Sequence, residues 1–122
     1  MARVLLIDDT PEIAELLTYS LRDHGFEVVT TGFDPGISEL VAEYHPDALV
    51  IDCSVYQMSE TLFDAVRANP HLAALPIVIV SDTPEQADAS LRKRDAQHVL
   101  LIPKPFTGGH IARALGQLLA PA

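Results

Sequence analysis

The chain has 122 residues, 48% of them hydrophobic and 20% charged, which is the composition of one soluble globular domain that buries a hydrophobic core. Its formal net charge of -9 disfavours direct binding to nucleic acid or to an anionic membrane surface, since both need clustered Lys and Arg. A single cysteine excludes an intrachain disulfide, and no apolar stretch is long enough for a secretory signal or a membrane span, so we expect one cytoplasmic domain over residues 1–122.

Five short apolar runs rich in β-branched residues predict five buried strands. In chain order they are Val4–Ile7, Phe26–Thr30, Ala48–Ile51, Pro76–Val80 and Val99–Ile102. The segments between and after these runs carry apolar residues at helical spacing. Strands that alternate with helices favour an α/β fold, in which helices cover both faces of a parallel sheet.

The first two helices have clear end signals. Thr10 is expected to be the N-cap of the first helix, with Pro11 at its first position and Gly25 just beyond its end. The second helix is expected to start at Asp34-Pro35 and to stop at Pro46, because proline cannot continue a helix.

The remaining helices are delimited in the same way. Ser59 is expected to cap the third helix, which ends before Pro70. The fourth helix repeats the entry chemistry of the first, with Thr83 as the N-cap and Pro84 at the first position. The fifth follows Thr107, where two glycines make a weak first turn.

Charged residues stand where three of the predicted strands end. Asp8 and Asp9 follow the first strand, Asp52 ends the third, and Lys104 follows the fifth. In a five-stranded parallel sheet of order 2-1-3-4-5, a doubly wound and flavodoxin-like arrangement, these ends meet in one cleft. We expect the carboxylates and the lysine to converge there.

Three carboxylates in one cleft need compensation, because like charges repel. Mg²⁺ suits them as a hard cation with oxygen ligands, whereas the scattered histidines and single cysteine offer no site for a softer metal. Lys104, held between two prolines, fits an arriving anion such as a phosphoryl group. Ser81, at the end of the fourth strand, offers the same anion a hydroxyl.

These features together resemble a bacterial response-regulator receiver domain, the chemotaxis-type single-domain phosphoacceptor of two-component signalling. The resemblance covers the whole chain, and all its motifs fall at the tips of the expected strands. It is carried by Asp8 and Asp9, Asp52, Ser81, and Lys104-Pro105-Phe106.

The resemblance implies a role for each of these positions. Asp52 would accept a phosphoryl group from a histidine kinase, a histidine phosphotransfer protein or a small acyl phosphate. Asp9 and Asp52 would hold Mg²⁺ directly, Asp8 would act mainly through bound water, and the backbone carbonyl of Ser54 would complete the ligands. Lys104 would pair with Asp52 at rest and with the phosphoryl oxygens afterwards.

The resemblance also implies how such a chain works. Ser81 would turn to bond a phosphoryl oxygen, and the moved loop would signal to an output protein. The chain would catalyse only its own phosphorylation and dephosphorylation, so it is not expected to be an enzyme acting on a separate substrate. A homodimer through the face of the fourth helix, fifth strand and fifth helix is a further expectation.

The sequence departs from the family pattern at several positions. The segment after Asp52 lacks the usual Met-Pro pair and glycine and brings Tyr56 near the site. Asp82 replaces a small residue after Ser81, and Leu101 stands where an aromatic residue normally takes part in switching. These departures favour an alternative function, that of a degenerate receiver serving as a phosphorylation-independent interaction module.

Two other classes of protein fit less well. A Mg²⁺-dependent phosphatase with an aspartate nucleophile usually carries a second acid two residues on, where this chain has Thr10 after Asp8 and Ser54 after Asp52. A flavin-binding protein would need a phosphate-binding loop after the first strand, where two acids would repel the anion.

Overall fold

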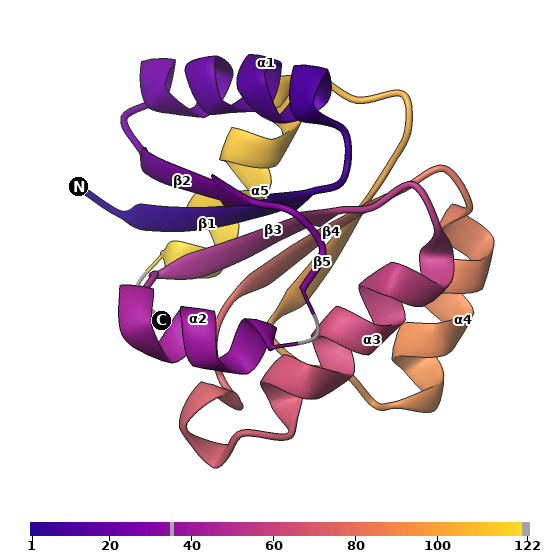
Figure 1. The fold of residues 1–122 in the computed structure, drawn as a ribbon. Helices are drawn as coiled ribbons and strands as arrows, with labels where there is room; N and C mark the ends of the chain where they lie inside the picture. Colours follow the sequence, from indigo (N-terminus) through magenta and orange to yellow (C-terminus); the bar gives the residue numbers. More distant parts are fainter. Residues whose placement is uncertain (35, 121–122) are drawn as a thin grey trace.

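The computed structural model, which describes residues 1–34 and 36–120, contains a single parallel sheet with helices on both faces (Figure 1). Its strands are β1 (Arg3–Asp8), β2 (Glu27–Thr31), β3 (Ala48–Asp52), β4 (Ile77–Ser81) and β5 (Val99–Pro103). They lie in the order β2-β1-β3-β4-β5, which confirms the predicted topology. The central strands are buried because helices cover both of their faces, as the apolar runs predict.

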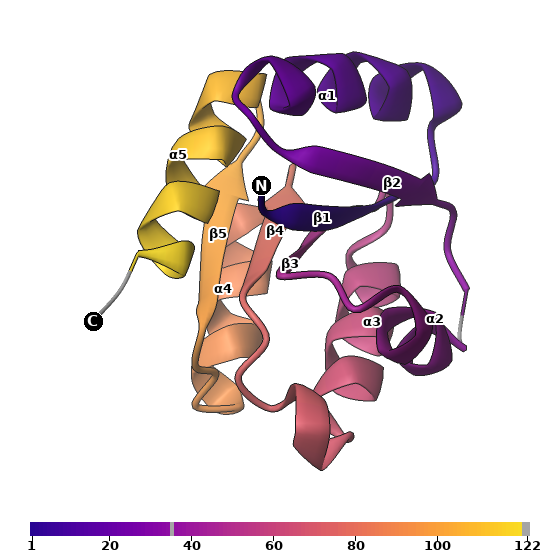
Figure 2. The ribbon, with the colours of Figure 1, turned by 90° about the vertical axis from the view of Figure 1, so that its left-hand side faces the viewer.

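The sheet separates two groups of helices, which Figure 2 shows on opposite sides of it. The helices are α1 (Pro11–Asp23), α2 (Ile37–Tyr44), α3 (Tyr56–Arg67), α4 (Pro84–Lys93) and α5 (Gly108–Leu119), with a 3₁₀ turn over Pro70–Leu72. The α1–α5 core takes Val4 and Leu6 from β1, and the opposite core takes Leu5 and Ile7. This alternation follows from the period-two geometry of a strand. None of the described helices is long and apolar enough to span a bilayer.

Most helix starts agree with the sequence signals. Thr10 and Thr83 stand at the N-cap positions of α1 and α4, although neither side chain makes a capping hydrogen bond. Gly25 follows α1 with a positive φ of 90°, a backbone conformation in which a side chain would be strained. The second helix, predicted to start at Asp34-Pro35, begins later, since α2 starts at Ile37; Pro35 itself lies outside the described residues.

The predicted cap at Ser59 is wrong. α3 begins earlier, at Tyr56, and Ser59 is buried inside the helix. Its position is explained by the apolar stripe of α3, because Ser59, Leu62, Phe63 and Val66 all lie on the buried face. A hydroxyl residue can begin a helix or lie on its buried face, and Ser59 is the first member of that stripe.

The strand ends differ slightly from the predicted ones: β1, β3 and β5 are longer, and β2 and β4 lie one residue later. The predicted strand over Phe26–Thr30 lies one residue later, and Thr31 pairs with Ile7. Pro76 directly precedes β4, and its carbonyl accepts a hydrogen bond from the Leu49 N–H at 2.9 Å.

The start of α5 is well defined despite its glycines. The Thr107 hydroxyl accepts a hydrogen bond from the backbone N–H of His110 at 3.2 Å, and the His110 ring accepts one from the Thr107 N–H. Gly108 lies against α1 so closely that a Cβ there would be 1.8 Å from the Ser20 hydroxyl oxygen. Only glycine therefore allows this approach of α5 to α1.

Candidate functional site

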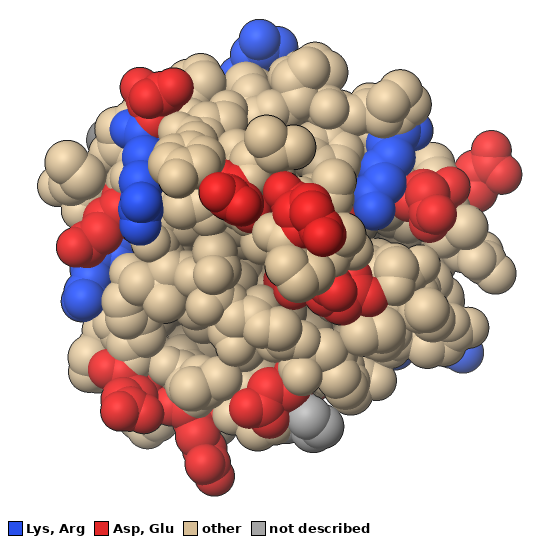
Figure 3. Space-filling model, turned by 45° about the horizontal axis from the view of Figure 1, so that its top comes forward, with Lys and Arg blue, Asp and Glu red and all other residues tan. Residues whose placement is uncertain are grey.

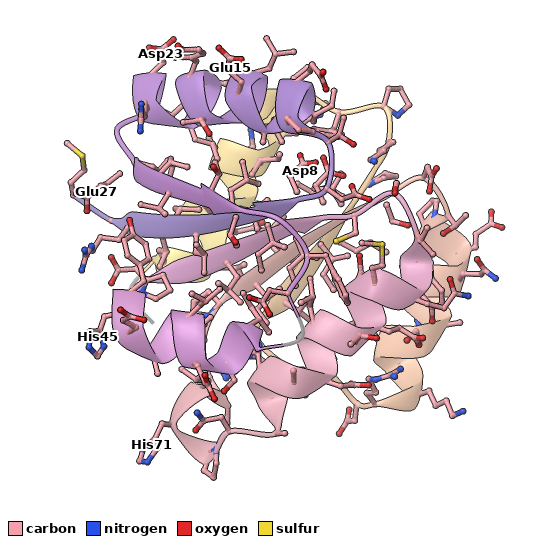
Figure 4. The ribbon with its side chains drawn as sticks, in the orientation of Figure 1. Asp8, Glu15, Asp23, Glu27, His45 and His71 are labelled. Atoms are coloured by element: carbon pink, nitrogen blue, oxygen red, sulfur yellow. The ribbon has the colours of Figure 1, made fainter. Side chains whose placement is uncertain are left out.

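The parallel pairing of β1 with β3 positions the first two residues of the site. Asp8 and Asp52 are partners in the parallel register, so the two carboxylates stand side by side at the ends of adjacent strands. Figure 4 shows Asp8 where β1 turns toward α1. Asp8 is 6% exposed and Asp52 is 2% exposed, so both acids are buried at the predicted edge of the sheet.

Each of these acids keeps one oxygen without a hydrogen-bond partner. Asp8 Oδ1 accepts a hydrogen bond from the Thr10 N–H at 2.8 Å, while Asp8 Oδ2 and Asp52 Oδ2 are buried and unpaired. Burial raises the pKa of Asp8 from its usual 3.8 to about 6; the Thr10 hydrogen bond opposes this rise and the charge of Asp52 adds to it. The hydrogen bonds around the pair thus leave one oxygen of each acid unsatisfied.

Lys104 supplies positive charge to this pair. Its Nζ lies 2.9 Å from Asp52 Oδ1, and its side chain is 30% exposed. Burial alone would lower the pKa of Lys104, but the hydrogen bond and charge of Asp52 outweigh it, so the pKa is raised. Asp82 and Asp8 act on Lys104 in the same direction, which means that one ammonium serves several carboxylates.

The loop that carries Lys104 is fixed to β4. The backbone N–H of Lys104 donates to the Ser81 carbonyl at 2.8 Å, and the Lys104-Pro105 peptide bond is cis. Ser81 itself is buried, and its hydroxyl accepts from the Thr83 N–H at 3.0 Å. Ser81 therefore lies at the expected strand end with its hydroxyl bonded to the Thr83 backbone.

Asp9 is engaged differently from Asp8 and Asp52. The Ser54 backbone N–H lies 3.1 Å from Asp9 Oδ1 and 3.2 Å from Asp9 Oδ2, and the Ser54 hydroxyl also donates to Oδ2. Over residues 1–34 and 36–120, no three or more His, Cys, Asp or Glu side chains are grouped so that they could hold a metal ion. Asp8 and Asp52 lie side by side as predicted, whereas Asp9 is bonded to Ser54.

A polar cluster between α3 and α4 lies beside the site, and the sequence reasoning did not identify it. The Tyr56 hydroxyl donates to Glu60 Oε2 at 2.6 Å, and the Ser90 hydroxyl donates to the same oxygen at 2.7 Å. Arg94 lies 3.2 Å from Glu60 and binds both oxygens of Asp64, at 2.7 and 2.9 Å. The (i, i+4) spacing from Tyr56 to Glu60 and from Ser90 to Arg94 was the available signal.

A small cavity of about 20 Å³ connects this cluster with the strand ends. Its lining includes Cys53, Tyr56, Ser81 and Arg94. Burial raises the pKa of the Cys53 thiol to about 12, so this buried residue packs as a small neutral side chain. The volume is about that of one water molecule, so the cavity is a packing space beside Ser81 and not a substrate pocket.

Acidic side chains are spread over the face that carries α1. Figure 3 shows Asp and Glu in the middle of this face and toward its lower and side edges, with Lys and Arg toward its top and sides. An anion that approaches from this side meets repulsion unless a local cation offsets it. Lys104 is the cation that the structure places in contact with Asp52.

The residues match a known family along almost the whole chain. The family model described as "Response regulator receiver domain" matches residues 4–116. A curated relative, the transcriptional regulatory protein KdpE of Mycobacterium tuberculosis, is 28% identical over 106 residues, which are 87% of this chain and 46% of that protein. The chain thus spans about half the length of this relative.

Solved structures agree with the match. A putative response regulator from Chloroflexus aurantiacus superposes with a TM-score of 0.80 at 26% identity and covers 98% of both chains. The receiver domain of a sensor histidine kinase from Pseudomonas aeruginosa, which has a magnesium ion in its active-site cleft, gives 0.77 at 22% identity over 96% of both chains. The sheet order, the paired strand-end aspartates and the family match lead to one conclusion: the chain belongs to the response-regulator receiver domains of two-component signalling.

Proposed function

We propose that Asp52 accepts a phosphoryl group and that the chain works as a phosphorylation-controlled switch. The observation that carries this proposal is the state of the Asp52 carboxylate. It is buried, one oxygen is fixed 2.9 Å from the Lys104 ammonium, and the other has no partner. A fixed carboxylate with one free oxygen is suited to nucleophilic attack on phosphorus.

The reaction transfers a phosphoryl group without a net change of oxidation state. One oxygen of the Asp52 carboxylate forms a bond to phosphorus as the bond from phosphorus to the donor breaks. The donor is a phosphohistidine of a histidine kinase or phosphotransfer protein, which leaves as imidazole, or a small acyl phosphate, which leaves as a carboxylate. Lys104 remains beside the transferred group, where its ammonium offsets charge on the phosphoryl oxygens.

Mg²⁺ fits the residues of this site. The unpaired buried oxygens of Asp8 and Asp52 are hard ligands without a partner, and a cation would lower their mutual repulsion. Asp9 and Asp52 would hold the ion directly, Asp8 through water, and Ser54 through its backbone carbonyl. When bound, the ion neutralises charge on the transferring phosphoryl group. The magnesium ion in the Pseudomonas aeruginosa receiver supports this assignment.

Ser81 is the proposed reporter of phosphorylation. Its hydroxyl bonds to the Thr83 N–H at rest, directly before α4. Turning toward a phosphoryl oxygen would break that bond and free the start of α4 to move. In this proposal the chain signals by protein contact and has no turnover on a separate substrate.

The test is the intact mass of the metal-free protein after incubation with acetyl phosphate, with and without Mg²⁺. We expect one added phosphoryl group with Mg²⁺, and none in Asp52→Asn, which keeps the shape of the side chain and removes the nucleophilic carboxylate. Asp88→Asn, on the exposed face of α4, is the matched control and should gain the group as the parent does. An unmodified parent, or a modified Asp52→Asn, would refute the proposal.

A second function has one observation in its favour. Asp82 acts on Lys104 as an additional negative charge, and such a charge opposes the arrival of a phosphoryl dianion. This observation supports a receiver that acts as an interaction module without phosphorylation. A parent protein that stays unmodified with both acetyl phosphate and a panel of phosphorylated histidine kinases would favour this second function.

A further inference from the structure

We propose that Ser54 latches Asp9 in the metal-free protein and thereby competes with the divalent cation for that carboxylate. This inference rests on the proposed function, because it concerns the cation that the phosphoacceptor site would use. It assigns to the Ser54 hydroxyl a role in setting cation affinity, separate from the role expected of the Ser54 backbone carbonyl.

The latch consists of contacts that occupy both oxygens of Asp9. The Ser54 N–H reaches Oδ1 at 3.1 Å and Oδ2 at 3.2 Å, and the Ser54 hydroxyl donates to Oδ2. Hydrogen bonds to an ionised acceptor are among the stronger ones in proteins. Asp9 is therefore satisfied without a metal ion.

Asp8 and Asp52 differ from Asp9 because no serine occupies both of their carboxylate oxygens. Each has one buried oxygen that lacks a hydrogen-bond partner. A cation can bind these oxygens without breaking a hydrogen bond. At Asp9 the cation competes with the Ser54 donors for the lone pairs of Oδ1 and Oδ2, so the latch weakens coordination by Asp9 and the cation weakens the latch.

The hydroxyl is the part of the latch that can be removed without touching the backbone. Ser54 is exposed, directly after β3, so truncation to alanine leaves no buried cavity. Loss of the hydroxyl weakens the competitor in the free protein and leaves the expected backbone ligand in place. Since a hydrogen bond to a charged group at an exposed site contributes modestly, we expect Mg²⁺ to bind about three- to tenfold more tightly.

The experiment measures Mg²⁺ binding by titration calorimetry in the metal-free parent, Ser54→Ala, Ser54→Thr and Ser38→Ala. Ser38 lies on α2, where its hydroxyl accepts a bond from Asn69, and its variant controls for a serine-to-alanine change elsewhere. We expect tighter binding in Ser54→Ala, and parent-like affinity in Ser54→Thr, which keeps the hydroxyl, and in Ser38→Ala. Thermal unfolding without metal should show Ser54→Ala less stable than the parent, with a larger upward shift on addition of Mg²⁺.

The outcomes separate this inference from the function on which it rests. Mg²⁺ binding by the parent, with equal or weaker binding in folded Ser54→Ala, overturns the latch and leaves the phosphoacceptor proposal standing. Tighter binding in both Ser54→Ala and Ser54→Thr also overturns it, because the hydroxyl is then not the competitor. Absence of Mg²⁺ binding in all four proteins overturns both proposals.

Discussion

The strand-end site and the α3–α4 cluster both contain acidic side chains, but they differ in how far hydrogen bonds and cations satisfy the carboxylate oxygens. At the strand ends, Asp8 and Asp52 each keep a buried oxygen without a partner, and one lysine serves both. Between α3 and α4, Glu60 receives hydrogen bonds from Tyr56 and Ser90 and lies 3.2 Å from Arg94. The same chain thus satisfies its acids where they join helices and leaves two carboxylate oxygens unsatisfied at the strand ends.

The pKa directions express this difference. Burial raises the pKa of Asp8, which means that the folded protein resists the charged form. The hydrogen bond from Ser90, followed by that from Tyr56, lowers the pKa of Glu60, which means that folding favours its charge. Stability is therefore given up at the strand ends and gained at the helix interface, a pattern typical of functional sites.

The largest effect should come from Asp8→Asn, which removes one of the uncompensated charges. One pKa unit corresponds to 1.36 kcal/mol, so a rise from 3.8 to about 6 implies that ionised Asp8 costs about 2 to 3 kcal/mol of folding stability. Asparagine keeps an acceptor for the Thr10 N–H. We expect the variant to be about 2 kcal/mol more stable at pH 7 in urea unfolding without divalent cations.

The pH dependence fixes the sign of this effect. Because the folded pKa lies above the unfolded one, the penalty is absent below about pH 4 and grows as the pH rises through about 6. The gain from Asp8→Asn should grow over the same window. A gain that is independent of pH, or a loss at pH 7, would contradict the assignment of uncompensated charge to Asp8.

The opposite result is expected in the α3–α4 cluster. Arg94→Ala removes the partner that binds both oxygens of Asp64 and contacts Glu60. We expect a loss of about 1 to 2 kcal/mol, measured by urea unfolding, because the Arg94 side chain is 28% exposed and solvent screens part of the interaction. A stabilising Arg94→Ala would show that the two regions do not differ in compensation.

The rate of phosphoryl uptake in an Asp82 variant tests the charge balance at the strand-end site. Asp82→Ala removes an exposed negative charge that acts on Lys104, so an incoming phosphoryl dianion meets less repulsion. We expect phosphoryl uptake from acetyl phosphate about two- to fivefold faster, with a smaller gain at high salt. Asp88→Ala removes the same charge elsewhere on the surface and should leave the initial rate unchanged; equal acceleration in both variants would mean that only net charge matters.

The smallest effect should come from an exposed ion pair that belongs to neither region. Arg92 lies 2.8 Å from Asp88 on α4, with side chains 81% and 53% exposed. Surface pairs of this kind contribute little, so Arg92→Ala should change the unfolding free energy by less than about 0.5 kcal/mol. A loss as large as that of Arg94→Ala would show that contact distance, and not compensation, governs stability here.

The sequence predicted those parts of the site that depend on strand periodicity. Asp8 and Asp52 could be placed together because each ends a buried run, and parallel pairing brings such ends to one edge. The position of Lys104 at this edge could be predicted in the same way, because it follows the apolar run of the fifth strand. The roles of these residues in phosphorylation and metal binding stay predictions that the experiments above address.

The sequence patterns could not predict the conformations of the loops or which helix residues face each other across a packing contact. The bonds between Asp9 and Ser54 join positions 45 residues apart, through two loops that no periodicity describes. The Ser59 cap was misassigned because a hydroxyl residue can start a helix or lie on its buried face. The α3–α4 cluster was missed because its partners become neighbours only when the two helices pack together.

Gly108 has a consequence that extends beyond its own turn. No side chain fits between Gly108 and Ser20, so α1 and α5 pack here without room for even a methyl group. Lys104 lies in the short loop between β5 and α5, four positions before Gly108. A methyl group at this position would overlap the Ser20 side chain, so Gly108→Ala would force Ser20 or the start of α5 to move, and a residue without a side chain sets how closely the two helices approach.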